Sequence, residues 1–153
     1  MIVSRRAVSA YLARKLDDHT WIKRVKKAEL LDEIKRFKVR PIFQTPSWEH
    51  QLACWWLCLH YPRFMMALTM GAGKTKIVGD TITQLLRERK IHRALVVVPR
   101  IINIDSWVTD LDNHTSLEPW PIFTSDIEEK RELFHHPKGE VTIIDFQSLQ
   151  WAL

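Results

Sequence analysis

Apolar residues recur along this chain with two different periods, and their alternation predicts the elements. From residue 41 onward, short runs rich in β-branched residues, typical of buried strands, alternate with stretches whose apolar residues lie three and four apart, typical of amphipathic helices. The predicted strands cover residues 63–68, 94–98, 121–123 and 141–144, and the predicted helices cover residues 47–60, 74–89, 104–114 and 127–135. Such alternation predicts an α/β fold in which helices sandwich a parallel sheet.

Two further helices are predicted before this series, over residues 3–16 and 21–38. The helical pattern stops at Arg40, because Pro41 disfavours a helical conformation in the residue before it. We therefore predict a domain boundary at this point. A basic helical extension covers residues 1–40, and the amino-terminal part of an α/β domain covers residues 41–153.

The composition is that of a folded protein. Hydrophobic residues make up 46% of the 153 residues and charged residues 27%, which excludes a disordered chain and allows one well-buried core. No apolar run is long enough to span a bilayer, and the first residues lack the apolar centre of an export signal. We therefore expect a soluble cytoplasmic protein with no membrane partner.

The two cysteines, Cys54 and Cys58, lie four residues apart and share a helix face with His50, while His60 lies nearby. A metal site can be drawn from these side chains, but tetrahedral zinc needs a turn or a second element to bring its ligands together. We favour buried free thiols, which fit a reducing compartment.

The positive charge is unevenly placed along the chain. Residues 1–40 carry twelve basic and five acidic side chains, a net charge of +7, whereas the whole chain has a net charge of +5. The remaining residues therefore carry a net charge of −2. The positive field of the leading segment would attract a polyanion such as nucleic acid. A solvated helical face with no ligand is an equally weighted alternative.

The segment with the clearest chemistry follows the first predicted strand and reads Met70-Gly71-Ala72-Gly73-Lys74-Thr75. Two closely spaced glycines allow backbone N–H groups to surround a phosphate, the lysine supplies a positive charge for the outer phosphates, and the threonine offers a hydroxyl to Mg²⁺. This is the core of the Walker A pattern, and it predicts a nucleoside triphosphate as ligand. The alternative is a glycine turn that only begins a helix.

Several segments, taken in order, resemble the first RecA-like domain of superfamily 2 helicases and translocases, particularly the Snf-type branch. The resemblance covers about residues 43–153. It is carried by the phosphate loop, by residues 45–51 before it, and by two later strand ends, Val98-Pro99-Arg100 and Asp145-Phe146-Gln147. Leu68 departs from the family pattern, which more often has a small or acidic residue there.

This resemblance implies ATP and Mg²⁺ as ligands and assigns roles to particular residues. Gln51 would contact adenine, and Arg100 would contact the nucleic-acid backbone. The phosphates would be held by Met70, Gly71, Ala72, Gly73, Lys74 and Thr75, among which Lys74 and Thr75 would be catalytic and Thr75 would bind Mg²⁺. The alternatives are a solvent-facing helical glutamine at position 51 and an exposed strand-end arginine at position 100.

Two parts of the family pattern have no counterpart in the sequence. The acidic box that binds Mg²⁺ and orients the attacking water would come one strand later, and Asp145 lacks the following carboxylate. The second RecA-like domain with its arginine fingers is also missing. We therefore expect a fragment that hydrolyses ATP poorly or not at all by itself.

The first functional hypothesis is the ATP-binding portion of an ATP-driven DNA translocase or helicase, with DNA favoured over RNA and the second RecA-like domain as partner. The second is a non-catalytic module that binds nucleic acid through its basic extension while the nucleotide fold is inactive. A small P-loop kinase is less favoured. It would need a lid with basic residues, and Arg87, Arg89 and Arg93 lie too close to the loop helix.

Overall fold

The computed structural model describes residues 27–36, 41–61, 63 and 65–152. The helices in this part are α3 (Lys27–Arg36), α4 (Glu49–His60), α5 (Lys74–Arg87), α6 (Asn103–His114), α7 (Ile127–His135) and α8 (Phe146–Ala152). The strands are β1 (Ala94–Val98), β2 (Pro119–Pro121) and β3 (Val141–Asp145).

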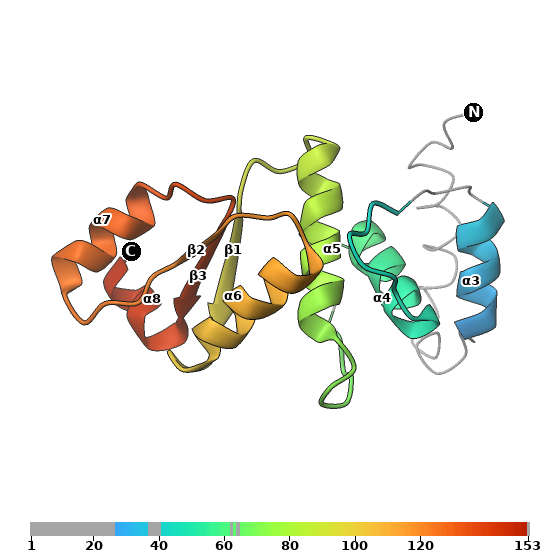
Figure 1. Cartoon of the computed structure of the whole chain (residues 1–153), viewed down its shortest axis with the longest axis horizontal. Coiled ribbons are helices and arrows are strands. Elements are labelled where there is room, and N and C mark those ends of the chain that lie inside the picture. Colours follow the sequence, from blue (N-terminus) through green and yellow to red (C-terminus); the bar gives the residue numbers. More distant parts are fainter. Residues whose placement is uncertain (1–26, 37–40, 62, 64, 153) are drawn as a thin grey trace.

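The three strands form one parallel sheet in the order β1-β3-β2. Ala94 of β1 pairs with Val141 of β3, and the register continues to Val98 opposite Asp145. The other edge of β3 pairs with β2. Because the strands run in one direction, their carboxyl ends meet at one edge of the sheet, which points towards the lower side of Figure 1. The prediction of a parallel sheet flanked by helices is confirmed.

Within the described part of the chain, three hydrophobic clusters hold the elements together. The largest lies between the sheet and helices α5 and α6, around Ile104 and Ile143, and a smaller one joins β2 and β3 to α7 and α8 around Ile122 and Ile144. A third unites α3, α4 and α5 around Trp55, which is 1% exposed. Each fully buried isoleucine stabilises the fold by roughly 1.5–3 kcal/mol.

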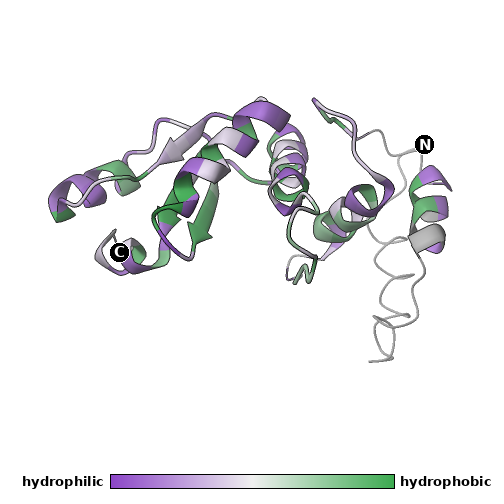
Figure 2. Cartoon of the chain, turned by 60° about the horizontal axis from the view of Figure 1, so that its bottom comes forward, coloured by the Kyte–Doolittle hydropathy of each residue, from purple (hydrophilic) through white to green (hydrophobic). Residues whose placement is uncertain are grey.

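In space the elements are arranged in a row, from α7 and α8 through the sheet to α5, α4 and α3 (Figure 1). Figure 2 shows that the hydrophobic residues gather on the central strands, while α7 is largely hydrophilic. No helix among the described residues is long and apolar enough to cross a membrane.

Most predicted elements after the phosphate loop are confirmed within two residues. Helices α5, α6 and α7 and strands β1 and β3 lie where the hydrophobic pattern places them, β2 begins two residues earlier, and α8 has no predicted counterpart. The predicted helix over residues 21–38 is found as α3 in its described part. The one predicted over residues 3–16 lies outside the described residues.

The strand predicted over residues 63–68 is wrong in its described part, because residues 63 and 65–68 have no strand structure. Met66 and Leu68 instead pack against the cluster around Trp55, which helices α3, α4 and α5 form. The apolar run is therefore used for packing against a helix and not for pairing in the sheet.

Helix α4 begins at Glu49, with Trp48 as its N-cap. The Thr45 hydroxyl, in the segment before this helix, lies 3.1 Å from Nδ1 of His114 at the end of α6. The strand over residues 94–98 is not covered on both faces, because Leu95 and Val97 are 48% and 41% exposed.

A buried ion pair joins α5 to the segment before α4. Lys76 Nζ donates to Asp80 Oδ2 over 2.6 Å, and the two side chains are only 6% and 3% exposed. The same ammonium donates to the Ser47 hydroxyl over 2.9 Å and lies 4.9 Å from the centre of the Phe43 ring. Burial raises the pKa of Asp80, and the neighbouring Lys76, Ser47 and His114 oppose that rise. The pair fixes residues 43–47 against α5.

We predict that Lys76→Met lowers the free energy of unfolding by about 3–5 kcal/mol, because it leaves the Asp80 carboxylate buried without its cation. The double variant Lys76→Met/Asp80→Leu should recover most of that loss, since an apolar pair of similar volume replaces both charges. Urea denaturation followed by circular dichroism measures these differences.

Lys35→Met is the matched control, because Lys35 and Asp32 of α3 form a pair in which both side chains are 80% exposed. Its loss should stay below about 0.5 kcal/mol. Equal effects of the two lysine substitutions would contradict the role given to the buried pair.

Candidate functional site

The predicted phosphate loop forms a tight left-handed bend at the amino end of α5. Gly71 and Gly73 both have φ of +78°, a conformation that side chains disfavour, and Gly73 is the N-cap of the helix. The fourteen-residue helix that follows points its free backbone N–H groups and the positive end of its dipole at this bend. An anion is the ligand that such an arrangement favours.

Gln51 of α4 lies against this bend. A Cβ atom at Gly73 would stand 2.3 Å from Nε2 of Gln51, so any larger residue there would displace this amide from the loop. That amide donates to the carbonyl of Ala72 over 3.3 Å, and Nε2 of His50 lies 3.0 Å from the same carbonyl. The Oε1 atom of Gln51 accepts from the backbone N–H of Trp48 over 3.0 Å. The start of α4 thereby braces the loop from one side.

Lys74 begins α5 and folds back over the loop. Its Nζ donates to the carbonyls of Leu68 and Thr69, over 3.0 and 2.8 Å. These contacts are solvent-exposed, so a phosphate oxygen can compete for the ammonium. Thr75 follows in the first helical turn and is half-buried, whereas Met70 at the tip of the loop is 98% exposed.

The loop thus brings together all the residues predicted for nucleotide binding: Gln51, Met70, Gly71, Ala72, Gly73, Lys74 and Thr75. Arg100 lies apart from them, two residues after the end of β1. The segment after β1 and the loop before α5 both lie towards the lower side of Figure 1, where the strands end and α5 begins. Ligands of open parallel sheets bind at this edge.

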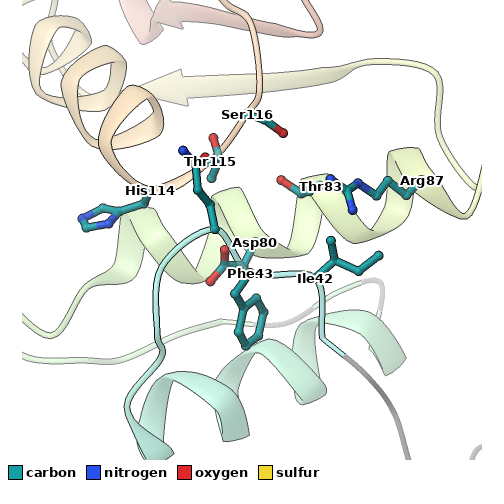
Figure 3. Close-up of a pocket in the computed structure, with 9 residues that line it drawn as sticks. Ile42, Phe43, Asp80, Thr83, Arg87, His114, Thr115 and Ser116 are labelled. Atoms are coloured by element: carbon teal, nitrogen blue, oxygen red, sulfur yellow. The ribbon is translucent and has the colours of Figure 1, made fainter.

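A cavity of about 210 Å³ lies beside Asp80 (Figure 3). It is bounded by residues 42–44, by α5, and by residues 114–116 after α6. None of the predicted site residues lines it, and its volume is below that of typical ligand pockets. We therefore do not place the nucleotide there.

A larger cavity of about 630 Å³ opens at the carboxyl ends of the strands. Its walls come from the segments after β1, β2 and β3 and from α7 and α8, and the lining residues are Arg100, Ile101, Thr124, Ser125, Lys130, Asp145, Gln147, Ser148 and Trp151. The cavity therefore includes the strand-end arginine that the sequence singled out.

Asp145, the last residue of β3, lines this cavity and is 4% exposed. Its Oδ1 accepts from the backbone N–H groups of Gln147 and Ser148, each over 3.0 Å, and so caps α8. Burial alone would raise the pKa of Asp145, but the hydrogen bonds from Ser148 and Gln147 and the charge of Lys130 outweigh it and lower the pKa. The carboxylate is therefore ionised at neutral pH.

The cysteines of α4 do not form a metal site with their neighbours. Both are free and half-buried, and burial raises the pKa of Cys58 to about 11, which disfavours the thiolate that binds metals. His50 and His60 contact backbone carbonyls instead. Among the described residues, no group of three or more His, Cys, Asp or Glu side chains could hold a metal ion.

Sequence reasoning missed three features of these sites. The Lys76–Asp80 pair has a signal in its spacing of four residues, which puts both side chains on one helix face. Lys130 and Trp151 have no such local signal. They reach the cavity only because α7 and α8 pack at the same end of the sheet.

Comparison with known families agrees with this geometry. The model of the family described as "Type III restriction enzyme, res subunit" matches residues 22–153. No curated protein matches the chain. Since the family match spans most of the sequence and includes the phosphate loop, the sheet and the strand ends, the chain belongs to the ResIII family and carries the ATP-binding RecA-like domain of a superfamily 2 helicase-type protein.

Proposed function

We propose that this chain holds ATP at the loop before α5 and that, together with a second RecA-like domain, it drives movement along DNA. The observation that carries the proposal is the bend at Gly71 and Gly73, both at φ of +78°, placed at the amino end of a fourteen-residue helix with Lys74 as its first residue. A helix start with these features binds phosphate through backbone N–H groups.

The residues at the loop fit a nucleoside triphosphate. The backbone N–H groups of residues 71–75 would receive phosphate oxygens, and the Lys74 ammonium would leave the carbonyls of Leu68 and Thr69 for the outer phosphates. The Thr75 hydroxyl would hold Mg²⁺, which when bound supplies charge neutralisation on the phosphates. Gln51 would contact adenine through its second amide hydrogen and the remaining lone pair of Oε1.

The strand-end edge is the proposed path of nucleic acid. Arg100 is exposed there and lines the 630 Å³ cavity, so its guanidinium can contact a phosphate of the backbone. The family takes its name from a subunit of a restriction enzyme, which favours DNA over RNA as the polymer. In this proposal residues 1–40 form a basic extension that adds attraction for the polyanion, and residues 41–153 form the amino-terminal part of the RecA-like domain.

Rapid hydrolysis would need groups beyond these residues. Asp145 does not replace the acid that orients the attacking water, because its Oδ1 atom caps α8 and no carboxylate follows it in sequence. We propose that an acidic pair and an arginine finger supplied by other segments complete the site. Such groups accelerate phosphoryl transfer by several powers of ten.

Lys74→Ala should weaken binding of Mg-ATP about ten- to hundredfold, because it removes a charged hydrogen-bond donor to the phosphates. Isothermal titration calorimetry with a non-hydrolysable ATP analogue measures the change. Lys138→Ala, which removes an exposed lysine outside the loop, is the control and should bind as the unsubstituted chain does. Unchanged affinity in the Lys74 variant would contradict the nucleotide assignment.

Arg100→Ala should weaken binding to duplex and single-stranded DNA and reduce the slope of log affinity against log salt by about 1, as expected for one lost phosphate contact. Fluorescence anisotropy over a salt series measures this slope. Arg93→Ala is the matched control, because Arg93 is exposed just before β1, at the opposite end of the strand. Equal slopes of log affinity against log salt for the two variants would contradict a contact between Arg100 and the DNA backbone.

Replacing Arg5, Arg6, Arg14 and Lys15 by glutamine should also flatten the salt dependence, by up to about 0.9 for each residue that contacts a phosphate. The control exchanges arginine and lysine at the same four positions and keeps the charge. Identical slopes for the glutamine variant and its control would favour a solvated helical face over a role of the extension in DNA binding.

A further inference from the structure

The 630 Å³ cavity carries chemistry that a contact to the DNA backbone does not use. It is large enough for one nucleotide unit, since typical ligand pockets have volumes of 300–1,000 Å³. Cationic, apolar and acceptor groups line different parts of it. A phosphate needs only the cations, so the other groups point to a base.

The cationic part of the cavity consists of Arg100 and Lys130. Arg100 follows β1 and is exposed, whereas Lys130 comes from α7 and is half-buried. Neither forms an ion pair within four ångströms of a carboxylate in the part of the chain that the structure describes. Two cationic side chains from separate elements can therefore bind one phosphate between them.

The apolar part consists of Trp151 and Ile101, which are 48% and 42% exposed. Trp151 is held in place through its backbone, because its carbonyl accepts from Nε of Arg131 over 3.1 Å. The same guanidinium binds Glu128 over 3.1 Å and thereby ties α8 to α7. The indole itself is half-exposed and offers a flat surface to a planar ligand.

The acceptor part is the free oxygen of Asp145. Its Oδ2 atom is buried and receives no hydrogen bond from the described residues, although Oδ1 accepts two. An unpaired buried carboxylate oxygen costs free energy, which a ligand N–H group would recover. A phosphate would be repelled at this point, whereas the amino or imino group of a base would be bound.

We propose that this cavity holds one unpaired nucleotide of single-stranded DNA, with its base stacked on Trp151 and its phosphate between Arg100 and Lys130. The inference rests on the proposed DNA path at Arg100 and adds a base contact to it. A base paired in a duplex presents only its edges in the grooves, and its faces are covered by neighbouring bases. Stacking on Trp151 therefore selects single strands over duplex.

The test compares binding of a short oligothymidine, the same strand with abasic sites, and a duplex of equal length, by fluorescence anisotropy. Trp151→Leu keeps an apolar side chain but removes the aromatic face, and it should weaken binding of the single strand about tenfold. Its effect on the duplex and on the abasic strand should stay below about twofold. Trp151→Phe keeps a stacking surface and should retain affinity within about threefold of the unsubstituted chain.

Phe146→Ala is the matched control, because Phe146 belongs to the same helix and is 70% exposed but does not line the cavity. It should leave all three affinities unchanged, and thermal melting of each variant establishes that the fold is kept. Lys130→Ala should weaken binding of all three ligands, because the phosphate contact does not depend on a base.

Two outcomes would overturn the inference. One is equal binding of the oligothymidine and the abasic strand by the unsubstituted chain, and the other is an unchanged single-strand affinity in a folded Trp151→Leu variant. If Arg100→Ala still weakens binding in either case, the proposed DNA path stands and only the base contact fails. If Arg100→Ala also has no effect, the path itself is wrong.

Discussion

The left-handed backbone conformation of Gly71 and Gly73 is the constraint on which the shape of the loop before α5 depends. The loop bends left-handed at two glycines, and at the second of these even a methyl group would collide with the amide of Gln51. Because that amide also binds the carbonyl of Ala72, α4 and the loop form one unit. Under the proposed function, the amino end of α5 is therefore held in a conformation that receives a phosphate without a prior rearrangement of the backbone, which lowers the cost of binding.

The buried pair of Lys76 and Asp80 connects α5 to the segment before α4. The pair spans the first two turns of α5, and its Lys76 ammonium contacts the Ser47 hydroxyl and the ring of Phe43. The segment that places Trp48, and with it the start of α4, is thereby fixed to the same helix whose amino end forms the loop. A charge pair of this kind contributes little net stability compared with an apolar pair, so its value lies in the position that it imposes.

The sequence predicts the sheet and the loop well, because their signals are local. The β-branched run over residues 94–98 and the glycine spacing at Gly71 and Gly73 each need only a few neighbouring residues to be recognised. Predictions fail where the structure of a segment depends on which other elements pack against it. The apolar side chains of Met66 and Leu68 are compatible either with a strand or with packing against the helical cluster around Trp55, and only the tertiary structure decides between the two.

The same reasoning explains the exposed face of β1 and the residues missed at the strand ends. A continuous apolar strand predicts cover on both faces, yet Leu95 and Val97 remain 48% and 41% exposed, because cover depends on where helices pack. Lys130 and Trp151 are ordinary helical residues in sequence. They become candidates for binding only when α7 and α8 bring them to the end of β3.

Packing between the loop and the strand ends determines how the two sites can communicate. Helix α5 lies on α6 so closely that a Cβ atom at Gly79 would come within 2.9 Å of Thr115 and 3.0 Å of Leu111. Helix α6 in turn begins just after Arg100, whose carbonyl accepts from the N–H of Asn103 over 2.9 Å. Close-packed interiors of this kind have low compressibility and transmit strain. Under the proposed function, ATP therefore cannot change the distance between the loop and Arg100 by much, and stepping along DNA must come from motion of a second domain against this one.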